Sequence, residues 1–533
     1  MADSDDVPLS RLWDVLIIGS GAAGMSSALA TIQEGSRSVL IIDKCPPTWA
    51  GGNGYFTAGA YRTSHGGLHD LLPLVSNVPK DLVNKIDLTP YTNDDFMGDM
   101  LRVTGKRCDP VLSKVLVEES RDAIGWLKEY CGVEFQLSFR RQAYEVDGRY
   151  KFWGGLALTV KEGGKGLIAN LNASARRLGA KFAFNTAAQR LLVDEASGAV
   201  VGVQALRKGE VVNIRAKSVI MCAGGFEASP SLRAQYLGPG WDLAHVRGTP
   251  YNTGDMLLAA QRDVQAATKG NWSGCHSVAW DANSDPNSGD REKTNEFTKS
   301  GYPLGLMINS QGERFVDEGV DLRNYTYAKF GRAILQQPGG IAFQIWDKKS
   351  IGWLRDEEYR DEIVKRITAQ SVEELADKCS QDGIEAKQKF VQTIHEYNNA
   401  VRAHRREHGE GKFDPAVKDG LSTQSSDNGL ALPKSNWALT IAEAPFLAVK
   451  VGSGCTFTFG GLAIDETTAN VKSAVSGKPI EGLYCAGEMV GGLFFGNYPG
   501  GSGLTSGGVF GRRAGAAAAE RARRGGNGEQ PRL

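Results

Sequence analysis

Residues 14–24 read Asp-Val-Leu-Ile-Ile-Gly-Ser-Gly-Ala-Ala-Gly, and they carry the clearest structural signal in the chain. The four apolar residues Val15–Ile18 predict a buried parallel strand. Gly19, Gly21 and Gly24 follow at the spacing G-x-G-x-x-G. This order of strand and glycines predicts a tight turn that leads into a helix packed closely on the strand.

The flanking residues complete a dinucleotide-binding unit. A run compatible with a helix covers 22–34, and a second apolar strand over 39–42 ends on Asp43. The glycines let the backbone approach a pyrophosphate, and the helix N-terminus supplies free N–H groups and partial positive charge. Asp43 is placed to accept a hydrogen bond from a ribose hydroxyl. The motif leaves open whether FAD or NAD is bound.

Length and composition predict an ordinary globular protein with several domains. The 533 residues suggest about two to four domains. Hydrophobic residues make up 41% and charged residues 23% of the chain, which is typical of globular proteins. Basic and acidic residues balance at 61 each, so charge gives no reason to expect nucleic acid or an anionic membrane. No apolar run reaches the roughly 18 residues of a transmembrane helix.

The cysteines and the termini indicate an intracellular protein. The eight cysteines are scattered without metal-site spacing, so reduced thiols and no metal are expected. The acidic N-terminus is not a secretory signal, which favours the cytoplasm. Pro531–Leu533 resembles a weak peroxisomal tripeptide, with a frayed end as the alternative. Residues 1–10 are expected to be a disordered tail and 524–533 a flexible one.

The pattern of strands and glycine turns recurs in two places far apart in the sequence. The strand predicted over 219–222 leads into Ala223 and Gly224, and residues 481–488 again combine an apolar strand with a glycine turn. Between 251 and 440 this pattern is replaced by polar loops and by charged segments that are predicted to be helical. We therefore expect an α/β fold in which a discontinuous Rossmann-like domain, 11–250 with 441–523, carries an inserted α+β substrate-capping domain over 251–440.

Four blocks in the chain match a known family in its order. They are Gly19–Gly24, Gly51-Gly52-Asn53 with Thr57-Ala58-Gly59, Thr253-Gly254-Asp255, and Tyr484-Cys485-Ala486-Gly487-Glu488. With them the chain resembles the fumarate reductase/succinate dehydrogenase flavoprotein superfamily (FAD-binding 2 type), which includes 3-ketosteroid dehydrogenases. Within it, the stretches 50–62, 274–276, 312–318, 322–327, 457–461 and 496–503 are similar to FAD-dependent tricarballylate dehydrogenase.

The resemblance implies FAD rather than NAD. Glu488, behind a glycine at a strand end, can accept from a ribitol hydroxyl, and the start of the last helix can direct its dipole at the flavin. Some members bind flavin covalently through a histidine where Asn53 stands here, so noncovalent FAD is expected. The predicted cofactor residues are Gly19, Gly21, Ala22, Ala23, Gly24, Asp43, Lys44, Gly51, Gly52, Asn53, Thr57, Ala58, Gly59, Ala223, Gly224, Asp255, Gly487, Glu488, Ser502, Gly503 and Leu504.

The resemblance also implies a reaction and its residues. The superfamily moves hydride between a substrate carbon and flavin N5 while a proton moves at the neighbouring carbon, next to a carbonyl. Arg323 matches the arginine that exchanges this proton, and an ion pair with Glu318 or Asp321 is the alternative. His276 matches a carboxylate-binding position, and the alternative is a plain loop histidine. Tyr325 is a candidate helper, with Tyr327 beside it.

Other positions near the expected flavin are candidate substrate contacts or departures from the family pattern. Arg62 is a candidate carboxylate clamp, with a surface charge as the alternative, and Tyr498 before Pro-Gly resembles the ketone-polarising tyrosine of 3-ketosteroid dehydrogenases. Thr456 and Phe457 stand where fumarate reductases place a histidine. The residues 298–301 lack the acid and arginine of a fumarate reductase proton relay. These departures argue against fumarate itself.

Three functions follow as expectations. The first is a dehydrogenase that forms a C=C bond in a carboxylate, as in tricarballylate to cis-aconitate. The second is a 3-ketosteroid-dehydrogenase-like or fumarate-reductase-like enzyme on another enone or carboxylate. The third is a noncatalytic electron-transfer flavoprotein subunit. Without iron–sulfur cysteine spacing, a separate acceptor is expected, either oxygen, a quinone or a redox protein.

Overall fold

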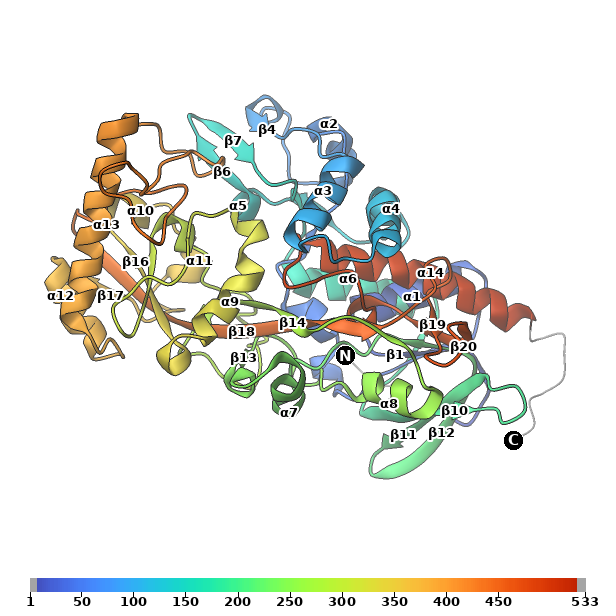
Figure 1. The fold of residues 1–533 in the computed structure, drawn as a ribbon. Helices are drawn as coiled ribbons and strands as arrows, with labels where there is room; N and C mark the ends of the chain where they lie inside the picture. Colours follow the sequence, from blue (N-terminus) through green and yellow to red (C-terminus); the bar gives the residue numbers. More distant parts are fainter. Residues whose placement is uncertain (1–6, 525–533) are drawn as a thin grey trace.

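The computed structural model describes residues 7–524 and confirms the predicted α/β class. Residues 1–6 and 525–533, which hold most of both expected tails and the Pro531–Leu533 tripeptide, lie outside the described residues. Figure 1 shows two parts joined by long strands, with helices packed on both parts. Within 7–524, no helix has the length and apolar character needed to span a bilayer.

An eight-stranded sheet carries the glycine motif. Parallel pairs join β1 (Trp13–Ile18) to β2 (Val39–Ile42) and β2 to β9 (Lys181–Ala183). On its other edge β1 pairs in parallel with β12 (Glu210–Met221), which pairs in turn with β20 (Pro479–Cys485). The remaining strands are β10 (Thr186–Val193), β11 (Val200–Arg207) and β19 (Asn470–Lys472). Both ends of the chain therefore contribute to one sheet.

The register of this sheet places the turns of the motif together. Ile18 lies opposite Ile42 on one side and Met221 on the other. Because these strands are parallel and end level, the segments that begin at Gly19, Asp43 and Cys222 leave the same edge. The carboxyl edge of such a sheet is where ligands bind in open α/β folds.

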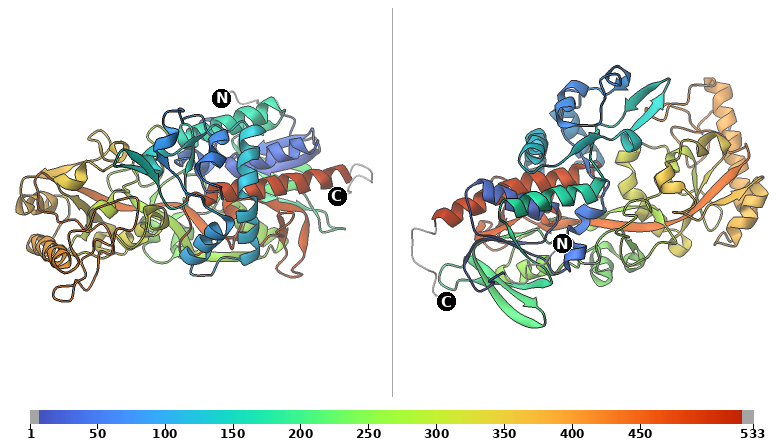
Figure 2. Two further views of the ribbon diagram at one scale, coloured as in Figure 1. Left: turned by 90° about the horizontal axis from the view of Figure 1, so that it is seen from above. Right: turned by 180° about the vertical axis from the view of Figure 1, so that it is seen from behind.

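The helices α1 (Ala22–Gln33) and α14 (Ser502–Arg524) lie side by side along this sheet (Figures 1 and 2). Their backbones approach so closely that small residues are required. A Cβ at Gly515 would lie 2.4 Å from the Ser27 carbonyl oxygen, and one at Gly511 would lie 3.0 Å from the Ala23 carbonyl oxygen. The glycine- and alanine-rich sequence of α14 thus serves helix packing as well as the cofactor end.

A six-stranded sheet forms the other part. Its order is β13 (His245–Val246), β18 (Phe446–Leu462), β16 (Ala342–Trp346) and β15 (Leu306–Asn309), and β14 (Thr268–Asp281) and β17 (Ile367–Ala369) also pair with β18. The expected boundary at 441 assigned β18 to the nucleotide-binding part, whereas its partners all belong to this sheet. An apolar strand does not reveal in sequence which sheet it joins. In Figure 1 the paired strands β14 and β18 run from one part towards the other.

Three further segments contain helices or a long strand. Residues 93–129 form two helices, α3 (Asn93–Val103) and α4 (Pro110–Glu129), because Asp109 Oδ1 accepts from the Val111 N–H at 2.8 Å and starts a new helix. The predicted strand over 219–222 is the end of the longer strand β12, which begins at Glu210. The charged region 357–406 contains α11 (Asp356–Tyr359), α12 (Val372–Ser380) and α13 (Lys387–His408).

Two small sheets and several short helices complete the described residues. The strands are β3 (Ala60–Tyr61), β8 (Leu158–Val160), β5 (Phe135–Leu137), β4 (Ile86–Asp87), β7 (Arg149–Phe152) and β6 (Ala143–Val146). The helices are α2 (Leu68–Leu71), α5 (Phe139–Gln142), α6 (Gly163–Arg177), α7 (Pro230–Leu232), α8 (Asp255–Val264), α9 (Tyr327–Leu335) and α10 (Lys348–Ile351).

Candidate functional site

A cavity begins at the carboxyl edge of the eight-stranded sheet and reaches the six-stranded sheet. Gly19, Asp43 and Asp255 line its nucleotide end, and His276 and Arg323 line its other end. We call these the nucleotide end and the substrate end. Residues from both halves of the chain meet in it, so neither half builds the site alone.

The glycine turn at the nucleotide end cannot carry side chains at its tightest points. Gly19 has φ +107°, and a Cβ there would lie 2.3 Å from the Cys222 carbonyl oxygen. A Cβ at Gly24 would lie 2.0 Å from the Gly19 carbonyl oxygen. Gly21 differs, since its Cβ would meet only the Gly51 carbonyl oxygen at 3.6 Å. Close backbone packing therefore requires glycine at positions 19 and 24. At Gly21 the absence of a side chain instead leaves space for a ligand on the cavity side.

Acidic and basic side chains converge beside this turn. Asp43 Oδ2 accepts from the Ser20 N–H at 2.8 Å and from Ser20 Oγ at 2.7 Å. Lys44 Nζ lies 2.5 Å from Asp255 Oδ2. Thr253 Oγ1 donates to the other Asp255 oxygen at 2.8 Å. These contacts hold polar groups at the wall where a nucleotide would present its hydroxyls and phosphates.

Two adjacent carboxyl groups lie near the middle of the cavity. Glu488 is half-buried and lines the wall, whereas Glu227 is fully buried and is not a lining residue. Glu488 Oε1 accepts from the Thr458 N–H at 2.7 Å, and Glu227 Oε1 accepts from Asn252 Nδ2 at 2.6 Å. Burial raises the pKa of Glu488 to about 7. Burial and the adjacent Glu488 raise the pKa of Glu227 well above its usual range, so the pair holds a proton at neutral pH.

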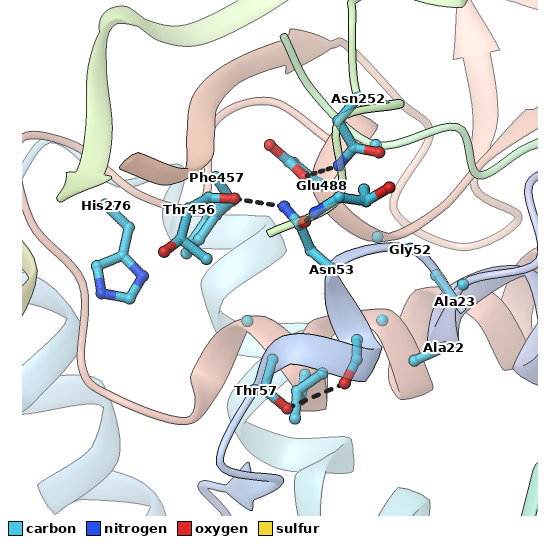
Figure 3. Close-up of a pocket in the computed structure, with 18 of the residues that line it drawn as sticks. Ala22, Ala23, Gly52, Asn53, Thr57, Asn252, His276, Thr456, Phe457 and Glu488 are labelled. Atoms are coloured by element: carbon cyan, nitrogen blue, oxygen red, sulfur yellow. Dashed lines mark hydrogen bonds between the residues drawn. The ribbon is translucent and has the colours of Figure 1, made fainter. Parts of the chain in front are cut away.

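Asn53 lies between these carboxyl groups and β18 and contacts both. Its Oδ1 accepts from the Thr249 N–H at 2.9 Å, and its Nδ2 donates to the Thr456 carbonyl oxygen. Figure 3 shows Asn53 between Thr456 and the pair Asn252–Glu488, with His276 beyond Thr456. The proton that the pair retains joins Glu227 to Glu488. Glu488 lines the cavity and is therefore the carboxyl group of the pair that a ligand can reach.

The residues present fit an FAD. The glycine turn, the charged groups beside it and Glu488 form a long polar wall, and Gly503 and Leu504 at the start of α14 bring its N-terminus to the cavity. The predicted cofactor residues that line the cavity are Gly19, Gly21, Ala22, Ala23, Asp43, Lys44, Gly52, Asn53, Thr57, Ala58, Ala223, Gly224, Asp255, Gly487, Glu488, Gly503 and Leu504. Gly24, Gly51, Gly59 and Ser502 are not lining residues.

Arg323 lies at the substrate end, in a short helical turn before α9. Its Nη1 donates to Ser300 Oγ at 3.1 Å, and its Nε is buried without a partner among the described residues. The expected ion pairs are absent, because Glu318 pairs with Arg314 and Asp321 pairs with Arg102. Burial, reinforced by the like charge of Arg355, lowers the pKa of Arg323 to about 9.

An acid and two further arginines surround Arg323. Ser300 Oγ donates to Glu358 Oε2 at 2.5 Å and accepts from Arg355 Nη1 at 3.0 Å. Arg141 Nη2 lies 3.4 Å from Glu358 Oε1. Although burial opposes it, the arginines, with Arg355 first, lower the pKa of Glu358 to about 2. The segment 298–301 contains no acid and no arginine, and the acid and arginine that contact Ser300 are Glu358 in α11 and Arg355, the residue before α11.

His276 is a buried ring on β14 at the same end. Its centroid lies 4.8 Å from that of Tyr327 and 5.1 Å from that of Tyr498, and the two tyrosine hydroxyls contact each other. Burial, followed by the charge of Arg247, lowers the pKa of His276 well below its usual value, so the ring is neutral. Its Nε2 is buried without a partner among the described residues.

Arg62 and Tyr325 lie behind the site, so the expected substrate contacts require correction. Arg62 Nε donates to the Gly500 carbonyl oxygen at 2.8 Å, and its Nη1 donates to Tyr91 Oη at 2.9 Å. Tyr325 Oη donates to Asp99 Oδ2 at 2.6 Å. Neither side chain lines the cavity. Their polar groups instead tie together backbone segments under the substrate end.

Arg247, which was not among the residues predicted from the sequence, lies at the substrate end of the cavity. It is buried, with 7% of its surface exposed, and its Nη1 donates to Thr456 Oγ1 at 2.9 Å. Arg247 precedes Thr253-Gly254-Asp255 by only six residues, so its place beside a cofactor block was a usable signal. Asn252 and Thr249 lie in the same segment and also line the cavity.

Comparison with known proteins agrees with this geometry. A family model described as "FAD binding domain" matches residues 14–504. A probable fumarate reductase of Shewanella frigidimarina is 27% identical over 96% of this chain and 76% of its own length. A urocanate reductase of Eggerthella lenta is 27% identical over 95% of this chain and 74% of its own length.

Solved structures show the same fold. The open conformation of a flavocytochrome c3 fumarate reductase superposes with a TM-score of 0.70 at 25% identity, over 96% of this chain and 79% of that one. A 3-ketosteroid delta1-dehydrogenase from Sterolibacterium denitrificans gives a TM-score of 0.71 at 18% identity, over 96% of this chain and 100% of that one. The chain belongs to this FAD-binding family of the fumarate reductase type and is an FAD-dependent oxidoreductase that acts on CH–CH groups.

Proposed function

We propose that the chain interconverts a saturated carboxylate or carbonyl compound and its α,β-unsaturated counterpart. The observation that carries this proposal is the position of Arg323, which has a lowered pKa and faces the same cavity as the glycine turn. When bound, FAD supplies the flavin that exchanges a hydride with substrate carbon. The residues Asn53, Glu488 and Leu504 are proposed to hold it noncovalently.

Arg323 is proposed to exchange the proton at the carbon next to the carbonyl group. An arginine is an unusual acid–base group, because its ordinary pKa keeps it charged. Here burial and the neighbouring arginines bring the pKa to about 9, which is close enough to neutrality for proton exchange. Ser300 and Glu358 hold the guanidinium in place and compensate its charge.

His276 and the tyrosine pair are proposed to bind the electron-withdrawing group. A neutral His276 can donate one hydrogen bond to a carbonyl or carboxylate oxygen. Tyr327 and Tyr498 present two hydroxyls at one point, which suits the polarisation of a carbonyl oxygen. This contact favours a ketone-bearing substrate as a second candidate function.

A small-molecule substrate and a separate electron acceptor complete the proposal. Tricarballylate, oxidised to cis-aconitate, is the substrate that the sequence resemblance suggests. A noncatalytic electron-transfer subunit would have no use for a proton-exchanging arginine in its cavity. The placement of Arg323 and His276 on the cavity wall therefore supports an enzyme.

The test is a half-reaction with the purified holoenzyme under exclusion of oxygen. Saturated candidates, including tricarballylate, are added to the oxidised enzyme, and unsaturated candidates are added to the photoreduced enzyme. We expect flavin absorbance to bleach in the first case or to return in the second. Failure of every carboxylate and enone in both directions would refute the proposed function.

A further inference from the structure

Arg247 is a buried cation without a counter-ion. Its Nη1 and Nη2 donate to Thr456 Oγ1 and to Asn295 Oδ1, both neutral, at 2.9 and 2.7 Å. Its Nε is buried and has no partner among the described residues. Within 7–524 no acidic side chain forms an ion pair with it. A buried charge is costly unless it is paired, so the cavity must supply an anion when a ligand is bound.

The other cations on the cavity wall are already compensated by acids. Lys44 pairs with Asp255 at the nucleotide end. At the substrate end, Arg141 lies 3.2 Å from Glu357 and 3.4 Å from Glu358, and Arg323 shares Ser300 with Glu358. Arg247 is thus the cation on the described wall that has neither a direct ion pair nor, as Arg323 has through Ser300, an acid joined to it by a shared hydroxyl group. One carboxylate group of a ligand would neutralise the positive charge of Arg247.

The space beside Arg247 and His276 is enclosed by aromatic rings. Phe457 lies 5.2 Å from Phe459 and 5.9 Å from Phe494, measured between ring centroids. Tyr498 lies 5.1 Å from Phe457 and 5.3 Å from Phe494. We call these four rings and Tyr327 the aromatic cluster. Its members Phe457, Phe459, Phe494, Tyr498 and Tyr327 all line the cavity.

The aromatic part of this wall does not suit a further charged group. The phenylalanine rings offer no hydrogen-bond donors. A second carboxylate placed against these rings would be buried without a partner, which is strongly unfavourable. A flat apolar group gains from the same surface, because ring–ring contacts add to the burial of apolar area.

We propose that the substrate is a monocarboxylate whose reactive carbon–carbon bond joins the carboxylate to an aromatic or similarly flat apolar group, with Arg247 as its carboxylate anchor. This rests on the proposed function and narrows it away from polycarboxylates such as tricarballylate. In the reducing direction, the C=C bond of the substrate becomes a single bond. Bound reduced FAD would supply the hydride, with both electrons, to its β-carbon, and Arg323 would supply the proton to its α-carbon.

The first experiment compares probes on the photoreduced holoenzyme without oxygen. Cinnamate carries both groups, crotonate lacks the ring, cinnamamide lacks the charge, and fumarate and cis-aconitate carry extra carboxylates. We expect cinnamate to reoxidise the flavin with a second-order rate constant at least tenfold above those of the other four. Equal or faster reoxidation by fumarate or cis-aconitate would overturn this inference and leave the proposed function standing. Absence of any reaction, also with saturated acids on the oxidised enzyme, would overturn both.

The second experiment measures binding without turnover. Hydrocinnamate and its neutral amide are titrated into the oxidised holoenzyme, and the perturbation of the flavin spectrum gives their Kd. We expect Arg247→Met to weaken hydrocinnamate at least tenfold and to leave the amide within twofold. Arg177→Met, at an exposed position on α6, is the matched control and should change neither. Equal weakening of acid and amide by Arg247→Met would contradict the anchoring role.

Discussion

Arg323 and Glu358 meet at one hydroxyl, that of Ser300, which accepts from Arg323 Nη1 at 3.1 Å and donates to Glu358 Oε2 at 2.5 Å. The guanidinium therefore has a negative charge nearby without a direct ion pair, and its Nε has no hydrogen-bond partner within residues 7–524. A direct bidentate pair would satisfy the guanidinium and stabilise its charged form more strongly. The indirect arrangement leaves Arg323 available to a substrate.

Replacement of Arg323 by lysine is expected to retain FAD and lose most turnover. Lysine keeps a positive charge but cannot contact Ser300 and the substrate at the same time with a planar group. Loss of a positioned proton donor typically costs about 10²-fold or more in rate. Stopped-flow measurement of the flavin half-reaction checks this, with Arg177→Lys on the exposed face of α6 as the control. Full activity of Arg323→Lys would exclude its role.

The pH dependence of the two directions should be opposite. The pKa of Arg323 is lowered to about 9, so the protonated form predominates below about pH 9 and the neutral form above it. Reduction of a C=C bond needs the proton and should therefore decline as pH rises through about 9. Oxidation needs the base and should increase over the same range. Rates of both half-reactions against pH test this, and parallel profiles would contradict it.

Glu358→Gln should move these profiles without removing Arg323. The negative charge of Glu358 raises the pKa of Arg323. Removal of this charge should therefore lower the pKa of Arg323 further and shift the pH dependence of both half-reactions to lower pH. Glu357→Gln is the matched control, since Glu357 pairs with Arg141 at 3.2 Å and not with Ser300. If Glu358 has only a structural role, the substitution would change stability or rate but not the pH at which the half-reaction rates change.

Gly21→Val is expected to give a folded protein without flavin. A Cβ at Gly21 meets only the Gly51 carbonyl oxygen, at 3.6 Å, whereas one at Gly19 would lie 2.3 Å from the Cys222 carbonyl oxygen. Valine methyl groups at position 21 would enter the cavity that the pyrophosphate needs. Flavin absorbance and thermal unfolding by circular dichroism measure the two effects. A yellow Gly21→Val protein would refute the prediction, and Gly19→Val should lose the fold instead.

Arg62→Met is expected to lower stability and leave substrate recognition unchanged. Arg62 is fully buried, donates to Gly500 and Tyr91, and lies 3.7 Å from Asp99. Its removal leaves buried acceptors unpaired, which costs about 3 kcal/mol in the free energy of unfolding. Chemical denaturation measures this loss. A raised KM with unchanged stability would restore the role of substrate clamp.

Local spacing in the sequence was enough to predict the nucleotide end. The glycine turn after β1, the acid after β2 and the return of the pattern near Glu488 each depend on a few neighbouring residues. Their backbone requirements, such as the positive φ of Gly19, are met by residue type alone. The family and its cofactor therefore follow from residues read in order, as the match over 14–504 confirms.

The substrate end depended on contacts between segments far apart in the chain. Arg323 and Glu358 come from different elements, and Arg247 meets Thr456 only because β13 and β18 pair side by side. The direction of a side chain such as Arg62, away from the cavity, also follows from packing that no local pattern encodes. Burial then set the pKa of Arg323 and the neutral state of His276. Local residue chemistry thus fixed the cofactor, whereas long-range packing fixed which charges face the substrate.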